Sequence, residues 1–420
     1  DSVASRGLGD VYKRQARAAW VEPWLQALPA PSGELAPVQQ RGRAALAATP
    51  LPPARAEDWS FTDLSLLAQL PIAVAAAAVD CPLPAPQPGA LRLHWNGRQD
   101  PLAGVDLPAG LQPLTATEIA QGLGHTLAAT GCEQHWPVEL NHACAERVLA
   151  LRLGRRQQLS LELISTAGEG LQPLRLLLLL EEKAELDLSQ LLRAEAAGLH
   201  SLVVEVHLAR GARLRHGLVA LGRSDAALLA HLAVEQEPES QVNLSNVLAG
   251  WGLARFEPRL VQVDGQARTT LRSLQLVDGQ QIADTHSHVE FRGPEGELDQ
   301  LHKAVAAGQG RSVFNGAVRV PRAAQRTNAA QLSRTLLLSD RARIDTKPEL
   351  EIVADDVKCA HGATVSSLQT DELFYLQSRG IGADQAAGLL QRAFCEEVLR
   401  ELPAAARLWC PLERLLEVRG

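Results

Sequence analysis

The chain of 420 residues carries a net charge of −7, and 46% of its residues are hydrophobic but only 4% are aromatic. Its length suggests two or three domains, and its hydrophobic content suffices for a large core built mostly from Leu, Val and Ala. The negative charge argues against a nucleic-acid-binding surface, and no apolar run reaches the roughly 18–20 residues of a membrane span. We therefore expect neither nucleic acid nor a membrane among its partners.

Residues 1–15 differ in composition from the rest of the chain. They contain Tyr12, one of only two tyrosines, next to the lysine at position 13. The chain also contains no methionine. We interpret residues 1–15 as a non-native scar left by translation, and we expect the native protein to begin upstream of Ala16.

Residues 16–148 predict an N-terminal region of helical and mixed structure. Residues 16–49 contain helical material, which Pro52-Pro53 must end. The motif Arg-x-Glu-x-Trp-x-Phe-Thr follows at residues 55–62, and we interpret its aromatic side chains as an anchor that holds this segment on the core. Residues 81–115 are rich in Pro and Gly, which predicts irregular linker or edge structure.

From residue 149 the hydrophobic pattern has a period of two, as in residues 201–209, and this indicates strands. A longer repeat begins near Gln157, Ala184, Ala212, Ser240, Ala267 and Gly296, with steps of 27, 28, 28, 27 and 29 residues. Such a steady step, with turn-like clusters and no helices between strands, predicts a parallel β-helix (solenoid) over residues 149–365. A β-sandwich with regular hairpins is the alternative.

The repeat also predicts which side chains stack. Equivalent places in it are occupied by Leu186, Leu214, Val242 and Leu298. One coil of a solenoid cannot bury its own inner face, so stacking of coils must form the core. We expect these four side chains to lie above one another.

Two polar motifs inside the predicted solenoid are candidate sites. His286 and His288 are two residues apart and would share a strand face, which allows a metal, although we favour a solvated polar face. Asp355 and Asp356 are adjacent, so on a strand they would point to opposite faces and not act as a catalytic pair. No phosphate loop, dinucleotide glycine motif or serine nucleophile motif occurs in the chain.

Cys359 and His361 form the most informative pair. On a strand both would point to the same face, and a thiol beside an imidazole suits zinc, copper or an iron–sulfur species. Two ligands do not fill a tetrahedral site, so the other ligands would come from elsewhere in the fold or from a partner. By spacing alone, a structural thiol is the alternative. The six cysteines are scattered without Cys-x-x-Cys, which favours reduced thiols in a cytosolic protein.

Residues 366–420 predict a C-terminal helical domain. One short helix is expected over residues 371–378, a longer one over 384–402 and a third over 404–418. In the second, Ala387, Leu390, Phe394, Val398 and Leu402 form an apolar stripe at helical spacing. The fold class is therefore mostly β, a parallel β-helix core flanked by N-terminal and C-terminal helical regions.

Several stretches resemble the SufB/SufD family of iron–sulfur cluster assembly proteins. The resemblance runs from about residue 55 to 402 and includes the motif at residues 55–62. It is most specific over residues 345–364, from Asp-Thr-Lys-Pro-Glu to Cys-Ala-His-Gly, and continues through 373–381, Leu-Phe-Tyr-Leu-Gln-Ser-Arg-Gly-Ile. No cysteine lies between residues 149 and 345, which favours the SufD branch over SufB.

The resemblance implies a non-catalytic scaffold subunit of the SUF complex. Such a subunit pairs with SufB through its β-helical core and holds the ATPase SufC on its C-terminal helices. The family implies that Cys359 and His361 lie near the SufB interface, where a transient iron–sulfur cluster forms. A homodimer is an alternative assembly for the isolated chain. The alternative function is that of a β-helical enzyme, such as a polysaccharide lyase or a metal-dependent hydrolase. The sequence does not determine the stoichiometry or whether iron, sulfide or a flavin binds this chain directly.

Overall fold

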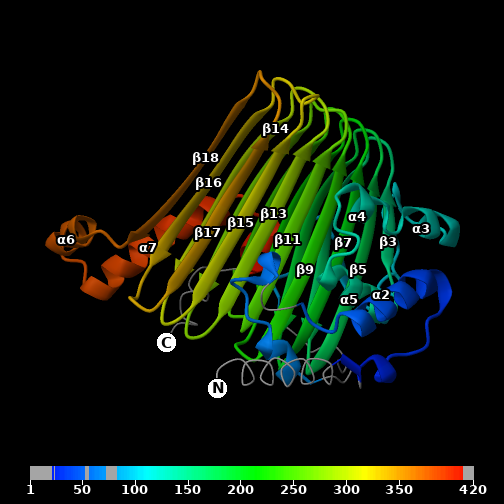
Figure 1. The fold of residues 1–420 in the computed structure, drawn as a ribbon, viewed down its shortest axis with the longest axis horizontal. Coiled ribbons are helices and arrows are strands. Elements are labelled where there is room, and N and C mark those ends of the chain that lie inside the picture. Colours follow the sequence, from blue (N-terminus) through cyan, green and yellow to red (C-terminus); the bar gives the residue numbers. More distant parts are fainter. Residues whose placement is uncertain (1–20, 23, 53–55, 72–82, 410–420) are drawn as a thin grey trace, which may run out of the picture.

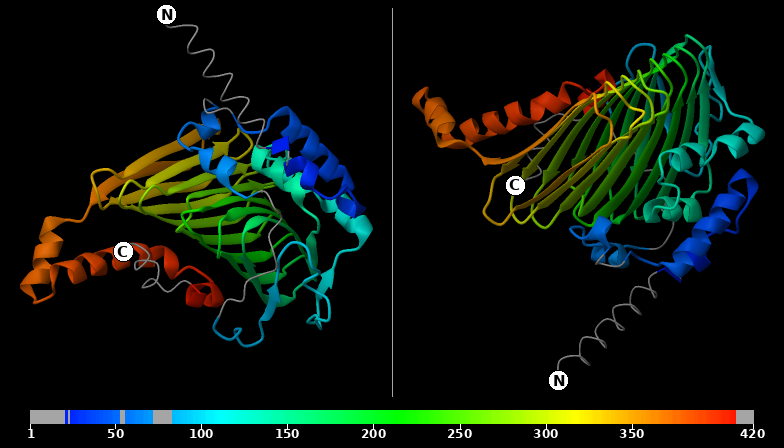
Figure 2. Two further views of the ribbon diagram at one scale, coloured as in Figure 1. Left: turned by 90° about the horizontal axis from the view of Figure 1, so that it is seen from below. Right: turned by 45° about the horizontal axis from the view of Figure 1, so that its top comes forward.

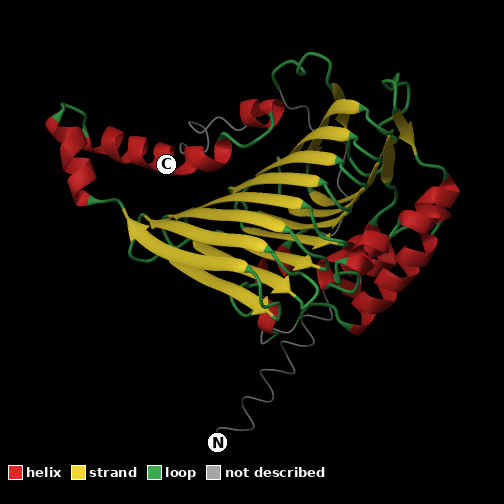
Figure 3. Ribbon diagram, turned by 90° about the horizontal axis from the view of Figure 1, so that it is seen from above, coloured by secondary structure: helices red, strands yellow, loops and turns green. Residues whose placement is uncertain are grey.

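The computed structural model describes residues 21–22, 24–52, 56–71 and 83–409. Residues 1–15, interpreted as a scar, lie outside the described residues. Two nine-stranded sheets face each other (Figures 1 and 3), and from β3 on the chain alternates between them from one strand to the next. Neighbouring strands in both sheets pair in parallel, except that β2 and β3 are antiparallel. The predicted parallel β-helix is confirmed.

The two sheets are named by their last strands. Sheet A ends in β17 and sheet B in β18. The strands of sheet A are β2 (Leu111–Pro113), β3 (Leu149–Leu153), β5 (Gly170–Leu180), β7 (Gly198–Leu208), β9 (Ala226–Gln236), β11 (Leu253–Gln262), β13 (Ile282–Phe291), β15 (Arg311–Val320) and β17 (Arg343–Ile352). The strands of sheet B are β1 (Leu91–His94), β4 (Gln158–Ala167), β6 (Glu185–Ala194), β8 (Arg213–Leu221), β10 (Gln241–Ala249), β12 (Arg268–Val277), β14 (Glu297–Ala306), β16 (Asn328–Leu337) and β18 (Lys358–Ser367).

A left-handed backbone position recurs in the turn before successive strands of sheet B. Each such residue lies two positions ahead of its strand. They are Arg156, Lys183, Gly211, Glu239, Gln266, Glu295 and Arg326, with φ between 53° and 69°. Only Gly211 is a glycine, the residue that adopts this conformation without a steric penalty. The turn-like clusters of the sequence repeat therefore mark a real, repeated turn.

The predicted stack of side chains is confirmed by the strand register. Leu186 pairs with Leu214, which pairs with Val242. Thr269, which the sequence repeat did not single out, is the next member and pairs in turn with Leu298. All five are buried in the space between the sheets, where Leu, Val and Ala dominate the core.

The N-terminal helices lie against the outer face of sheet A (Figure 2). They are α2 (Ala36–Ala48), α3 (Ala116–Gly122), α4 (His125–Ala129) and α5 (Trp136–Cys144). Helix α5 packs on both α2 and strands β5, β7 and β9. Irregular linker or edge structure was expected over residues 81–115, and in the described part of this range β1 and β2 form edge strands of the two sheets.

The C-terminal helices follow the outer face of sheet B (Figure 3). They are α6 (Thr370–Ser378), α7 (Ala383–Leu399) and α8 (Ala404–Trp409). Val398 and Leu402 of the predicted stripe are buried there against Val219 and Val247 of the sheet. Helix α6 has no buried residue and projects past the last coil (Figure 1). Positions 410–418 of the third predicted helix lie outside the described residues. Among the helices that the structure describes, none has the length and apolar character needed to cross a membrane.

Candidate functional site

Cys359 and His361 lie on β18, the last strand of sheet B. Their register partners on β16 are Ala329 and Gln331. Cys359 and His361 lie on one face of β18, as their spacing predicts, because residues two apart on a strand share a face. That face is the one that points into the solenoid in every earlier coil.

The column that contains Cys359 explains its exposure. It continues the column of Leu298 and Ala329, both of which are 3% exposed. Cys359 packs against the end of this core and is only half-buried. His361 is exposed, whereas Gln331 above it is buried. Both predicted ligands therefore lie on the interior face of the solenoid, at the end of the stack that no described coil covers.

The two side chains find no third ligand among the residues that the structure describes. Among the described residues, the single cluster of three or more His, Cys, Asp or Glu side chains with metal-binding spacing lies elsewhere. Burial raises the pKa of the Cys359 thiol above its usual value, so an added cation or metal would be needed to favour the thiolate. The ligand shortage expected from the sequence holds in the described part of the chain. Whether the pair binds a metal stays a prediction.

The last coil ends in two strand edges that pair with no strand among the described residues. Strands β17 and β18 are each ten residues long, and each pairs with a neighbour on one side only. Ile352, Val353 and Val365 are 40%, 55% and 57% exposed there. Long exposed edge strands with apolar side chains are ready to pair with another chain.

His286 and His288 point outward from β13, on the same side as Asp284. The His286 ring lies 3.0 Å from a carboxylate oxygen of Asp284, and Arg255 Nη1 donates to that carboxylate at 2.9 Å. The carboxyl of Asp284 is fully buried; burial would raise its pKa, but Arg255 and His286 outweigh burial and lower it. This face is therefore half-buried and ion-paired rather than solvated, because the N-terminal segment covers it.

Trp59 and Thr62 provide that cover. Arg255 lies over the Trp59 ring at 3.9 Å from its centroid, and Trp59 packs edge-on against Trp136 at 6.2 Å. The Thr62 hydroxyl donates to Asp284. The aromatic anchor predicted from the motif is confirmed for Trp59, whereas Phe61 stays 40% exposed.

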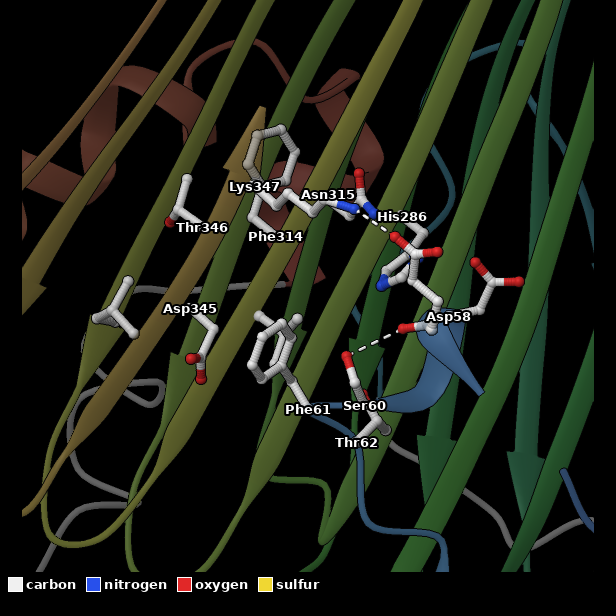
Figure 4. A pocket seen from close by; sticks show the side chains of 13 residues that line it. Asp58, Ser60, Phe61, Thr62, His286, Phe314, Asn315, Asp345, Thr346 and Lys347 are labelled. Carbon is white, nitrogen blue, oxygen red and sulfur yellow. Dashed lines mark hydrogen bonds and ion pairs between the residues drawn. The ribbon is translucent and has the colours of Figure 1, made fainter. Parts of the chain in front are cut away.

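A pocket of about 530 Å³ lies beside this anchor. Figure 4 shows Phe61 of the N-terminal segment on one side and Phe314, Asn315 and Lys347 of sheet A on the other. Lys347 Nζ reaches across it to Glu57 Oε1 at 2.8 Å. Most of its lining residues are polar or charged, whereas the walls of small-molecule pockets are mostly apolar.

Asp355 and Asp356 lie in the loop between β17 and β18 and are exposed. They are not on a strand, so the expectation that their side chains point to opposite faces of a strand is wrong. Both are exposed to solvent rather than enclosed in a pocket, which disfavours a catalytic pair.

Sequence reasoning missed a third group. His135, His231 and Glu257 bring three metal-ligating atoms within 4.8 Å of one another. Burial would raise the pKa of the Glu257 carboxyl, but Arg255 and His231 hold it well below its usual value. These residues are far apart in the sequence; the register pairing of His231 with Glu257 is the one signal that the repeat contains.

Of the four cysteines in the described part of the chain, three are buried. Cys132, Cys144 and Cys395 belong to hydrophobic clusters under the helices. Cys81 and Cys410 lie outside the described residues. Cys359 is therefore set apart from the other described cysteines by its partial exposure.

Comparisons with known proteins identify the family to which the solenoid is similar. Residues 163–394 match the family model described as "SUF system FeS cluster assembly, SufBD core domain". An iron–sulfur cluster assembly SufBD family protein of Synechocystis is 33% identical over 386 residues, which cover 85% of each chain.

Two further relatives match over shorter ranges. The chloroplastic protein ABCI7 of Arabidopsis thaliana is 40% identical over 202 residues, which cover 48% of this chain and 42% of that protein. The iron–sulfur cluster assembly protein SufD of Escherichia coli is 32% identical over 198 residues, which cover 47% of each chain. These two alignments span less than half of the relatives' length.

Proposed function

The chain belongs to the SufBD family of iron–sulfur cluster assembly proteins, and from this premise we propose that it is a SufD-like, non-catalytic scaffold subunit. It pairs with a SufB-like subunit through its last coil and binds a SufC-like ATPase through its C-terminal helices. A nascent cluster forms at the pairing surface, with Cys359 and His361 among its ligands. Iron and sulfide are cargo in this role.

The observation that carries the proposal is the uncovered last coil. Strand β17 is the edge of sheet A and β18 is the edge of sheet B, and each is ten residues long. The outer edge of such a strand presents a row of backbone N–H and C=O groups that no neighbouring strand in its sheet pairs with. Proteins that act alone blunt such edges with short strands, bulges or a covering helix. Helix α6 leaves this edge and projects outward (Figure 1). A second β-helix stacked here would continue both sheets and cover Val353 and Val365.

The position of Cys359 and His361 supports a shared cluster. Both side chains face the surface that the second subunit would cover, and the described part of this chain offers them no third ligand. A partner strand docked on β18 would bring its own side chains opposite them at a spacing of about 5 Å. Such an arrangement completes a ligand set only when the two subunits are assembled.

The C-terminal helices divide into a packed part and a free part. Helix α7 ends against sheet B, where Val398 and Leu399 are buried. On α6, Phe374 and Tyr375 remain 71% and 58% exposed. Exposed aromatic side chains of this kind are enriched in protein interfaces. The free part is the surface that we assign to the ATPase.

The cluster role is tested by co-expression with the SufB-like partner, followed by anaerobic purification and analysis of iron and acid-labile sulfide. Cys359→Ala and His361→Ala should each lower the iron and sulfide per complex, while the complex still elutes as one species. Cys132→Ala, which removes a buried thiol remote from β18, serves as the control and should keep wild-type iron. Wild-type cluster content in the Cys359→Ala/His361→Ala double variant would overturn the metal role.

The ATPase role is tested with α6 because its aromatic residues can be changed without uncovering the core. Phe374→Ser combined with Tyr375→Ser should abolish co-purification of the ATPase and leave the solenoid folded by circular dichroism. Phe61→Ser changes an aromatic side chain that is 40% exposed at the opposite sheet and is the matched control. Unchanged ATPase binding by the α6 variant would remove this assignment.

The isolated chain offers one alternative occupant of the last coil, namely a second copy of itself. Light scattering of the purified chain, alone and with the SufB-like partner, distinguishes the two. A dimer that dissociates as the partner is added supports a shared surface. A stable dimer that coexists with a bound partner would place the partner elsewhere and contradict the proposed pairing.

A further inference from the structure

A compact group of His135, His231 and Glu257 lies on the outer face of sheet A, away from Cys359 and His361. His231 and Glu257 are register partners on β9 and β11. His135 is the N-cap residue of α5, which packs over β9. Three separate elements thus contribute one side chain each.

The distances within this group match those between the ligands of one metal ion. His135 Nδ1 lies 3.3 Å from His231 Nε2 and 3.2 Å from Glu257 Oε2, and His231 Nε2 lies 3.0 Å from Glu257 Oε2. Ligand atoms at zinc distances of about 2.0–2.2 Å in a tetrahedral arrangement are separated by about 3.3 Å. A single ion placed just above the plane of these three atoms would contact all of them.

The surroundings orient the carboxylate for this role. Arg255 Nε donates to Glu257 Oε1 at 2.6 Å, which leaves Oε2 directed at the two imidazoles. Arg255 also donates to Asp284 at 2.9 Å. Partners that hold the second oxygen or nitrogen of a ligand are typical of metal sites.

The charge balance favours a cation. Arg255 contributes +1, while Glu257 and Asp284, which it contacts, contribute −1 each, so the sum is −1. All three side chains are at most 3% exposed. A net charge buried in this way is costly unless another ion compensates it. The nearby Arg259 adds a positive charge of its own, and its guanidinium donates to the neutral carbonyl of Thr130.

Solvent reaches the group from one side. His231 and Glu257 are buried, but the His135 side chain is 29% exposed. An ion could enter there and keep a water molecule as a fourth ligand. Two histidines and one carboxylate with an open position suit Zn²⁺ and Fe²⁺.

We propose that His135, His231 and Glu257 bind one divalent first-row transition-metal ion. Bound there, the ion ties α5 to β9 and β11, and so fixes the N-terminal helices on the solenoid. The group is separate from the proposed cluster site, and its test needs no partner protein. The competing explanation is a hydrogen-bonded group in which both imidazoles donate to Glu257.

The test uses the full chain with Cys359→Ser and His361→Ala, which removes the other candidate ligands. After chelator treatment, Zn²⁺ binding is measured by calorimetry, and Co²⁺ is used as a probe because its visible bands report a four-coordinate site. We expect one Zn²⁺ per chain and a rise in the melting temperature with added Zn²⁺. Since the loss of a supporting residue already weakens metal binding by 10–100-fold, His135→Ala should weaken it by at least about 100-fold.

Two further variants complete the test. Glu257→Gln keeps the shape of the side chain and should also abolish the Co²⁺ bands. His207→Ala removes a histidine that is likewise 29% exposed but pairs with Glu235 and Glu237, and it should bind Zn²⁺ normally. If the chain with Cys359→Ser and His361→Ala binds no Zn²⁺, or if His135→Ala and Glu257→Gln bind it unchanged, the group is only hydrogen-bonded and the proposal is wrong.

Discussion

At the residue scale, a buried ion pair holds the N-terminal helices on the solenoid. Arg175 Nη2 donates to Glu205 Oε1 at 2.6 Å, and the two side chains are 1% and 0% exposed. Glu205 also accepts hydrogen bonds from the backbone N–H of Gly124 and Leu127, at the start of α4. Burial lowers the pKa of Arg175, which the charge of Glu205 opposes. Each charge therefore depends on the other.

Glu205→Leu should lower the free energy of unfolding by about 3–5 kcal/mol, because it leaves a buried guanidinium without its partner. The double variant Arg175→Met/Glu205→Leu should be more stable than Glu205→Leu alone, since no charge is then left unpaired. Urea unfolding of the three proteins measures both differences. Asp225→Asn, which breaks the exposed pair with Arg223, should cost at most about 1 kcal/mol. An equal cost at the two sites would contradict this account.

The repeated left-handed turn makes a second prediction at single residues. Lys183 has φ 60° and Gly211 has φ 69° at equivalent places in successive coils. Gly211→Ala should destabilise by about 1 kcal/mol, since an L-residue is strained there and its Cβ would lie 3.2 Å from Lys183. Lys183→Gly should be neutral or stabilise by up to about 1 kcal/mol, because it relieves the strain but loosens the unfolded chain. Lys183→Ala keeps the strain and is the control; thermal unfolding compares all three.

At the element scale, local patterns determined what could be predicted. The strands of the solenoid follow from apolar residues at period two, and the coils follow from the step between turns such as Arg210-Gly211. Strand β1 could not be predicted in this way. It has four residues in a Pro- and Gly-rich stretch, and it forms because the edge of β4 is available to pair with it.

In the candidate sites, too, only the features set by a local sequence pattern could be predicted. Cys359 and His361 could be placed on one face because a strand has a fixed side-chain alternation. Their position at an uncovered end depends on where the stack of coils stops, which no local pattern encodes. His135 meets His231 only because α5 packs on sheet A, so that group could not be predicted from spacing.

The stacked column makes the prediction that belongs to this scale. Leu214 is 1% exposed and lies between Leu186 and Val242. Leu214→Ala should lower the free energy of unfolding by about 2–5 kcal/mol, because a cavity opens between coils. Val365→Ala, at a side chain that is 57% exposed on the last coil, should change it by less than about 0.5 kcal/mol. Equilibrium unfolding in denaturant measures both, and a cost at Leu214 as small as at Val365 would contradict the stack.

At the scale of the whole molecule, the interior changes along the solenoid. In one interior column the early coils carry Leu161, Leu188 and, after His216, Leu244. Towards the last coil, amides replace them: Gln331 Nε2 donates to Gln300 Oε1 at 3.0 Å, and Gln300 Nε2 donates to Ser287 at 2.7 Å. His361 continues this column on β18. This column is therefore mostly apolar at the early coils and polar where the last coil is open, which fits a solenoid that is completed by a partner.

The buried histidines make the last prediction, which concerns the response of the whole fold to acid. Burial lowers the pKa of His200 and of His302 to about 3 and that of His216 to about 4. In the unfolded chain these imidazoles take up a proton near pH 6.5. Above that pH both states are neutral and stability is at its full value. As the pH falls below it, the unfolded chain binds protons that the fold excludes, so stability decreases. At pH 5 each such histidine should cost about 2 kcal/mol.

His302 allows this prediction to be tested at one residue. Its ring stacks on Phe314 at 4.3 Å between centroids, and neither ring nitrogen meets a hydrogen-bond partner among the residues that the structure describes. His302→Leu keeps an apolar side chain there and removes the proton-binding group. Between pH 7 and pH 5, unfolding in urea should show that the variant loses about 2 kcal/mol less stability than the wild-type chain. His125→Leu, at a side chain that is 65% exposed, is the control and should follow the wild-type curve. Parallel pH curves for His302→Leu and the wild type would mean that His302 does not contribute to acid unfolding.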